Sequence, residues 1–195
     1  AGITGALSNS NYRSALGGYL GHMAELYAFW ALAPRLSAEA GFPGHGPTFG
    51  VMAMGAFGCV AGGLLARSAG PGRVARWSLA ASAACGLVWP WAAHGPDWLS
   101  MAVLMIWGLT VVSDSPQFSA LASAASPSDG VAAAMTLMVC LGFGLTIPTI
   151  DAMTRIEATH GPWVGWALAV GPIAGLALMA TGSGKAMRTS KPTNN

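Results

Sequence analysis

The sequence contains six stretches of about 20 residues in which almost every side chain is apolar. They cover residues 14–36, 47–66, 74–93, 98–121, 131–150 and 162–181. A helix needs about 20 such residues to cross the hydrocarbon core of a bilayer. Strands of a transmembrane barrel alternate apolar and polar side chains over about ten positions, whereas these stretches are apolar on every side. The sequence therefore predicts an all-α fold, an integral membrane bundle of about six transmembrane helices.

The composition agrees with a chain that spends most of its length in lipid. Hydrophobic residues make up 53% of the chain and charged residues 8%, whereas a soluble domain carries about 25% charged residues. The shortage of charge extends along the whole sequence, which excludes a soluble domain with a single anchor. We expect a polar N-terminal linker (1–13), one transmembrane domain (14–184) and a polar C-terminal tail (185–195).

Other classes of function find little support in the sequence. The net charge is only +2 and the basic residues are dispersed, which argues against nucleic-acid binding. No group of residues has metal-ligand spacing, and His22 is the only deeply placed histidine, so we expect no metal or other cofactor. Ser183 superficially resembles the nucleophile of an intramembrane protease, but the sequence offers no suitable Ser–His pair. We therefore expect that the chain is not an enzyme.

The distribution of basic residues predicts the orientation of the bundle. Seven lysines and arginines fall on one side of the predicted segments and two on the other. The side that is richer in basic residues is normally cytoplasmic. Both termini are therefore predicted to be cytoplasmic, which agrees with an even number of crossings. The seven are Arg13, Arg67, Arg73, Arg76, Lys185, Arg188 and Lys191, and the two are Arg35 and Arg155.

Glu25 lies near the middle of the first segment, where an ionisable side chain costs at least about 2.5–3.5 kcal/mol to insert. Gly18, Gly21 and His22 fall on the same helical face. Burial disfavours the charged form of a carboxyl group, which makes proton coupling feasible at ordinary pH. We expect Glu25 to line a substrate or proton path, with His22 beside it. The alternative is that Glu25 only forms a hydrogen bond to a neighbouring helix.

Asp114 is the corresponding acid of the fourth segment. Thr110 lies four residues before it and Gln117 three residues after it, so a continuous helix would place all three on one face. This end of the segment approaches the cytoplasmic interface, and the alternative is an acid at the hydrated end of a helix. Because the first and fourth segments each carry one acid, we expect two inverted three-helix repeats.

Three runs of sequence resemble bacterial transporters of the major facilitator superfamily. Residues 19–30 (YLGHMAELYAFW) are similar to the first helix of the C-terminal half of these proteins. Residues 107–121 (WGLTVVSDSPQFSAL) resemble the tenth helix and the loop after it, and residues 141–147 (LGFGLTI) resemble the eleventh. The runs occur in the order that the family has.

The resemblance implies a function. Members of the superfamily have two six-helix halves around a substrate cavity, and they work by alternating access, often driven by the proton gradient. The first and fourth helices of each half line that cavity. The chain would then be half of a secondary active, proton-coupled transporter of a small solute in the bacterial inner (plasma) membrane. Its substrate and proton pathway would include Glu25, His22, Asp114, Gln117, Thr110 and Tyr19.

The family also has a gating loop between the second and third helix of a half, with the pattern Gly-x-x-x-Asp-Arg-x-Gly-Arg-Arg. Here Gly62 is followed by Ala66 where the pattern has the acid, and then by Arg67 and Arg73. Arg67 and Arg73 are therefore weak candidates for a gating role. Their charge is equally explained by the preference of cytoplasmic loops for basic residues.

A lone half would leave its cavity-facing side open to lipid, so we expect Glu25 and Asp114 to be unshielded without a partner. The expected partners are the bilayer, a small-molecule substrate and an N-terminal six-helix half. That half would belong to the same polypeptide, to a separate chain or to a second copy of this one. The missing initial Met favours a piece of a longer protein. The alternative function is a non-transporting membrane scaffold or regulatory subunit, in which neutralising Glu25 changes only stability.

Overall fold

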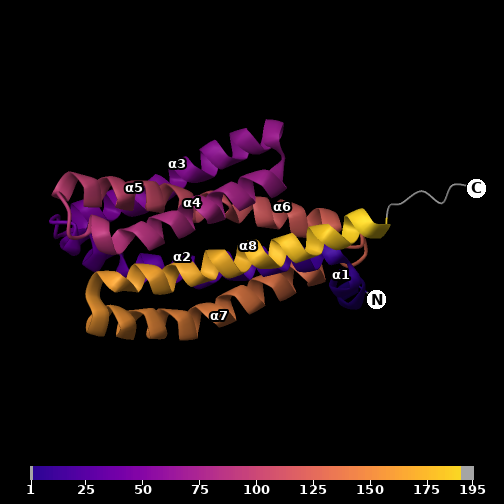
Figure 1. Cartoon of the computed structure of the whole chain (residues 1–195). Helices are drawn as coiled ribbons and strands as arrows, with labels where there is room; N and C mark the ends of the chain where they lie inside the picture. The colour runs from indigo at the N-terminus through magenta and orange to yellow at the C-terminus, as the bar shows by residue number, and fades with distance from the viewer. Residues whose placement is uncertain (1, 190–195) are drawn as a thin grey trace, which may run out of the picture.

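The computed structural model of the chain describes residues 2–189, with side chains to residue 181, and shows an elongated bundle of helices (Figure 1). No strand occurs among residues 2–189, so the predicted all-α fold is confirmed. The elements are α1 (Gly2–Ser8), α2 (Ser10–Glu39), α3 (His45–Ala69), α4 (Pro71–Ala92), α5 (Asp97–Ser113), α6 (Ser115–Ala125), α7 (Val131–His160), the 3-10 helix η1 (Gly161–Trp163) and α8 (Val164–Thr189).

The helices follow the apolar stretches of the sequence with two differences. The stretch 98–121 is divided between α5 and α6, and α7 continues beyond residue 150 to His160. The expected linker 1–13 contains α1 and the beginning of α2, and of the expected tail 185–195 only residues 185–189, at the end of α8, are described. In Figure 1, α1 and the end of α8 lie at the same end of the bundle.

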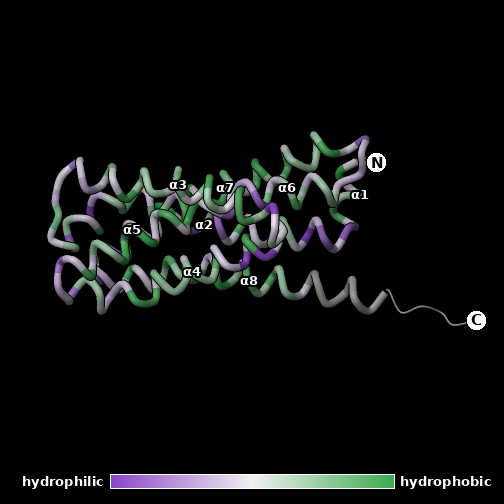
Figure 2. Tube along the Cα trace, turned by 90° about the horizontal axis from the view of Figure 1, so that it is seen from above, coloured by the Kyte–Doolittle hydropathy of each residue, from purple (hydrophilic) through white to green (hydrophobic). Residues whose placement is uncertain are grey.

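Three helical segments are long and apolar enough to cross a membrane: His45–Ala69, Asp97–Ala125 and Val131–Thr181. The last has 51 residues and turns back at η1, so that α7 and α8 run in opposite directions. Large apolar side chains are exposed on these segments, including Phe49 (73%), Ile147 (74%) and Val170 (63%). An exposed apolar surface of this extent indicates contact with lipid or a partner. Figure 2 shows hydrophobic residues along much of each helix, with the strongly hydrophilic ones mostly near helix ends and turns.

Helix α2 is the central helix of the bundle and packs against α8, α7 and α6. Three of its polar side chains, His22, Glu25 and Ser37, are buried against other helices. Phe29, Leu32 and Leu36 are buried to 1% exposure or less and anchor its second half in the core. Because α2 is enclosed by other helices, its polar residues are not required to face hydrocarbon.

Glycines allow several helices to approach one another closely. A Cβ atom on Gly21 of α2 would lie 2.5 Å from the Gly171 carbonyl oxygen of α8, and one on Gly62 of α3 would lie 2.6 Å from that of Ser113. A Cβ atom on Gly58 would overlap the carbonyl oxygen of Leu109. Small residues at such contacts let helix backbones pack in lipid. These glycines therefore form packing seams inside the bundle.

Candidate functional site

The fourth apolar stretch is interrupted at Asp114, between α5 and α6. Pro116 has no backbone N–H and cannot donate to the carbonyl of Val112, four residues earlier. That carbonyl instead accepts hydrogen bonds from the backbone N–H of Asp114 and from the Cys59 thiol of α3, the latter at a sulfur–oxygen distance of 3.6 Å. Inside a membrane, a backbone carbonyl freed by proline needs such a substitute partner. The interruption places Asp114 between two helices, deep in the bundle.

Asp114 meets His22 of α2 at this interruption. The Nδ1 atom of His22 lies 2.9 Å from Oδ1 of Asp114, and both residues are 1% exposed. The two atoms are at ion-pair distance but are not aligned as a hydrogen bond. Asp114 Oδ1 therefore lacks a hydrogen-bond partner among the described residues, and the other ring nitrogen of the histidine, His22 Nε2, also lacks one. Unpaired polar atoms at this depth are costly, which marks the pair as a candidate functional site.

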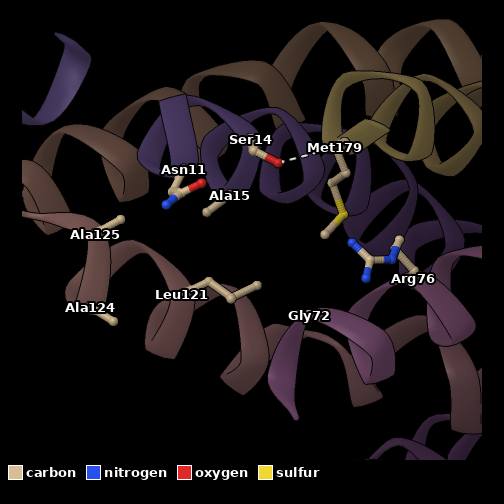
Figure 3. Close-up of a pocket in the computed structure, with 9 residues that line it drawn as sticks. All are labelled: Asn11, Ser14, Ala15, Gly72, Arg76, Leu121, Ala124, Ala125 and Met179. Carbon is tan, nitrogen blue, oxygen red and sulfur yellow. Dashed lines mark hydrogen bonds between the residues drawn. The ribbon is translucent and has the colours of Figure 1, made fainter. Parts of the chain in front are cut away.

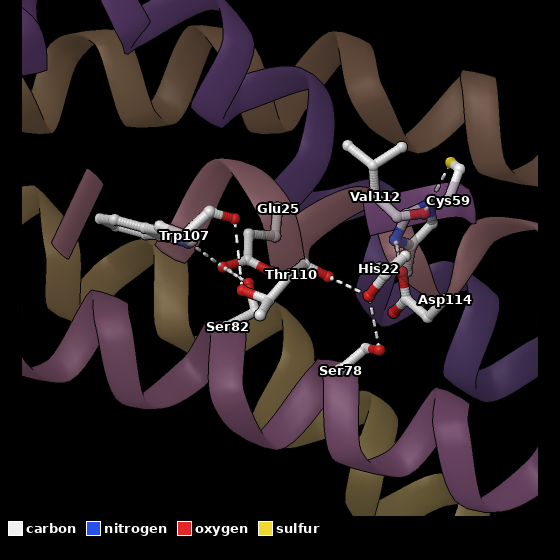
Figure 4. Close-up of polar contacts among 10 residues, drawn as sticks. His22, Glu25, Cys59, Ser78, Ser82, Trp107, Thr110, Val112 and Asp114 are labelled. Atoms are coloured by element: carbon white, nitrogen blue, oxygen red, sulfur yellow. Dashed lines mark hydrogen bonds and ion pairs between the residues drawn. The ribbon is translucent and has the colours of Figure 1, made fainter. Parts of the chain in front are cut away.

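Glu25 lies one helical turn beyond His22 and is also 1% exposed. Its Oε1 atom accepts hydrogen bonds from the Ser82 hydroxyl of α4 at 2.7 Å and from the Trp107 indole N–H of α5 at 2.8 Å. Figure 4 shows these contacts together with the His22–Asp114 pair. Glu25, His22 and Asp114 are close enough to interact electrostatically. We call these three side chains the buried triad.

A short polar chain lies beside the buried triad and joins α4 to α5. The hydroxyl oxygens of Ser78 and Ser113 are 2.6 Å apart. Ser113 also donates to the backbone carbonyl of Thr110 at 3.1 Å. Ser78 and Ser82 are four residues apart on α4, so both serines face the same part of the bundle interior. Hydroxyl groups both donate and accept hydrogen bonds, which suits them to relay protons.

Of the other predicted site residues, Tyr19 lies beside His22, Gln117 is buried in α6 and Thr110 is partly buried in α5. Tyr19 is 6% exposed, and its ring centroid lies 6.1 Å from that of His22. Gln117 is 4% exposed on α6. Thr110 is only partly buried, and its hydroxyl donates to the Ile106 carbonyl at 2.9 Å. Because the helix is interrupted at Asp114, Thr110 and Gln117 lie in different helices.

The two candidate gating arginines lie at the turn between α3 and α4. Arg67 is in the last turn of α3 and Arg73 in the first turn of α4, and both are exposed. Neither side chain makes an ion pair or hydrogen bond within the part of the chain whose side chains are described. Gly70, with a φ of +86°, makes the turn between them. The arrangement offers no contact that would hold a gate.

The expectation that the acids are unshielded without a second half is wrong. Helices α4 and α5 cover Glu25, and α2 covers Asp114. The physical reason is that Ser82 and Trp107 of this chain donate hydrogen bonds to the Glu25 carboxylate. The carboxylate can therefore be buried without losing its hydrogen-bond partners. The sequence analysis missed Ser82 and Trp107 as partners of Glu25. The spacing of Ser78 and Ser82 in an apolar helix was an available signal, whereas nothing marked Trp107 as a donor.

Of the five remaining acids, Asp129 lies beside α1 and the other four lie toward the opposite end of the bundle. Arg35 and Glu157 form an ion pair that joins α2 to α7. Glu39, the last residue of α2, accepts a hydrogen bond from the Trp89 indole N–H at 3.3 Å, and burial raises the pKa of its carboxyl group. Asp151 pairs with Arg155 one turn along α7. Among the described residues, no group of three or more His, Cys, Asp or Glu side chains has the geometry of a metal site.

Comparison of the chain with models of known protein families and with curated proteins finds no match. The resemblance of residues 19–30, 107–121 and 141–147 to transporters therefore stays a prediction.

Proposed function

We propose that the chain is one six-helix half of a proton-coupled secondary transporter in the bacterial inner membrane, with both termini cytoplasmic. The observation that carries this proposal is the burial of three titratable side chains, His22, Glu25 and Asp114, at 1% exposure in a bundle with segments suited to lipid. Ionisable residues within a membrane usually belong to an ion or substrate pathway. The interrupted helix at Asp114 is a further feature typical of transporter sites.

The proton would be taken up at the buried triad. In this mechanism a proton binds the Asp114 carboxylate and forms an O–H bond, which removes its attraction to His22. Asp114 occupies the N-cap position of α6 and its side chain makes no capping hydrogen bond there, so loss of the contact with His22 would free α6 to tilt relative to α5 at the interruption. Glu25 would exchange a proton with the other two members of the buried triad while Ser82 and Trp107 hold its carboxylate in place. The tilt would couple proton movement to opening of the solute pathway on one side.

The experiment is proton movement in proteoliposomes that contain the chain together with its partner half, with a pH-sensitive dye inside. A proton gradient is imposed and a panel of small solutes is added. We expect Glu25→Gln to reduce solute-dependent proton movement by about 10²-fold or more, because Gln cannot carry the proton. The amide oxygen of Gln still accepts hydrogen bonds from Ser82 and Trp107, so the fold should be retained.

The matched control is Asp151→Asn, which neutralises an exposed acid of α7 far from the buried triad. We expect it to leave coupled proton movement unchanged. Equal activity of Glu25→Gln and wild type would contradict the proposal. In that case Glu25 would not be part of the proton pathway.

One observation favours the second candidate function, a non-transporting scaffold or regulatory subunit. Both acids are shielded by this chain alone, as a purely structural polar core would be. On this alternative, no solute moves protons in wild type, and Glu25→Gln changes only the thermal stability of the bundle. Measuring the unfolding temperature of the same two proteins therefore separates the two functions.

A further inference from the structure

A cavity of about 240 Å³, open to the surface, lies beside the beginning of α2 (Figure 3). It is lined by the beginning of α2, the beginning of α4, the end of α6 and Met179 of α8. Its wall includes Asn11, Ser14, Ala15, Arg76, Leu121 and Met179. The buried triad is not part of this wall, so the cavity is a separate feature of the molecule.

The cavity has a polar rim and an apolar floor. Ala15 and Met179 form the floor and are each 2% exposed. The Arg76 guanidinium points into the cavity and the Asn11 amide faces it from the other side, as Figure 3 shows. Ser14 donates its hydroxyl hydrogen to the Met179 carbonyl at 3.1 Å. Neither Arg76 nor Asn11 uses its side chain in a hydrogen bond or ion pair with the described residues.

The charge around the cavity favours an anion. Among the residues whose side chains are described, Arg13, Arg67, Arg73 and Arg76 lie on this side of the predicted segments, and of the acids only Asp129 does. An excess of one sign raises the local concentration of oppositely charged ligands. A guanidinium group presents its N–H donors as a planar fork that matches two oxygens of a phosphate.

The size of the cavity and its level in the bundle restrict the kind of ligand that it can bind. At about 240 Å³ it is smaller than the roughly 300–1,000 Å³ of pockets for drug-sized molecules. Trp77, next to Arg76 on α4, is 53% exposed, and tryptophan side chains at helix ends gather at the level of lipid headgroups. An apolar floor below a cationic rim matches a molecule with a phosphate above an apolar portion.

We propose that this cavity binds a phosphate group, with Arg76 and Asn11 as its ligands. Two sources share this chemistry: the phosphodiester of an anionic phospholipid and a soluble phosphate. In either case Arg76 holds two phosphate oxygens, and the Asn11 side-chain amide donates to a third. The glycerol portion of a lipid would lie on Ala15 and Met179.

The test uses the full chain in detergent and titrates it with dioctanoyl phosphatidylglycerol, counting bound molecules by native mass spectrometry. We expect one molecule to bind, and Arg76→Gln to weaken this binding about tenfold or more, because the charge-assisted bonds are lost. Arg76→Lys keeps the charge but not the fork and should bind with intermediate affinity. The matched control is Arg73→Gln, which removes the same charge from the same helix outside the cavity and should change binding less than about twofold.

Titrations with two other ligands identify the source of the phosphate. Dioctanoyl glycerol, which has no phosphate, should not bind. Competition by millimolar inorganic phosphate would assign the site to a soluble phosphate, and its failure to compete would assign the site to the lipid. Equal losses in Arg76→Gln and Arg73→Gln would overturn the proposal in favour of general surface charge, as would binding of dioctanoyl glycerol or no binding to wild type.

Discussion

Asp114→Ala is expected to lower the free energy of unfolding of the bundle by about 3–5 kcal/mol, the loss typical when one partner of a buried ion pair is removed. The substitution leaves His22 at 1% exposure without its carboxylate partner. The imidazole would keep its hydrogen bond to the Val111 backbone, but its Nε2 atom has no partner among the described residues. Reversible unfolding of the purified chain in mixed micelles would measure the change.

Two further variants show whether the loss of stability in Asp114→Ala comes from the His22–Asp114 contact or from substitution as such. Asp151→Ala removes an exposed acid whose only partner is the exposed Arg155, and it should have no measurable effect. The double variant His22→Ala with Asp114→Ala should lose less than the sum of the single losses, by about 0.5–3 kcal/mol. Strictly additive losses would show that the 2.9 Å contact contributes nothing to stability.

The helical fold could be predicted from the sequence because the length and polarity of each apolar stretch are local properties. The interruption at Asp114 was not predicted, although Pro116 is visible in the sequence. A proline within a transmembrane helix can bend the helix or divide it, depending on which neighbour satisfies the freed carbonyl. Here the Asp114 N–H and the Cys59 thiol both donate to it, and Cys59, 53 residues before Val112 in the sequence, reaches this carbonyl only through the packing of α3 on α5.

The candidate site could be predicted only in part, for a similar reason. The spacing of His22 and Glu25 fixes their common face on any helix, and the cost of burying them made them conspicuous. Their partners depend on how helices pack. Trp107 counts as an apolar residue in a sequence, and only the fold turns its indole N–H toward Glu25. The expectation of unshielded acids was wrong because it treated the missing half as the only source of such partners.

The second large loss of stability is expected for a substitution where α3 packs on α5. A Cβ atom on Gly58 would overlap the Leu109 carbonyl oxygen, and because that atom belongs to a helix backbone it cannot rotate away. Gly58→Ala must therefore push α3 from α5, which would also weaken the Cys59–Val112 contact at the interruption. Overpacking of this kind costs about 1–3 kcal/mol. We expect a loss at the upper end of this range because a rigid carbonyl is the obstacle.

Gly63→Ala is the matched control, because it makes the same change five residues later on the same helix. No atom lies within 4 Å of the position its Cβ would take. Replacing glycine by alanine in an unobstructed helix stabilises it by about 0.5–1 kcal/mol, so the two variants should differ in sign. A thiol-reactive fluorophore would follow unfolding through the buried Cys85 and the partly buried Cys59 in a Cys140→Ser background, since Cys140 is exposed in the folded state. Equal stability of Gly58→Ala and Gly63→Ala would mean that α3 and α5 are not in contact at Gly58, and the support for the interruption at Asp114 would have to come from elsewhere in the bundle.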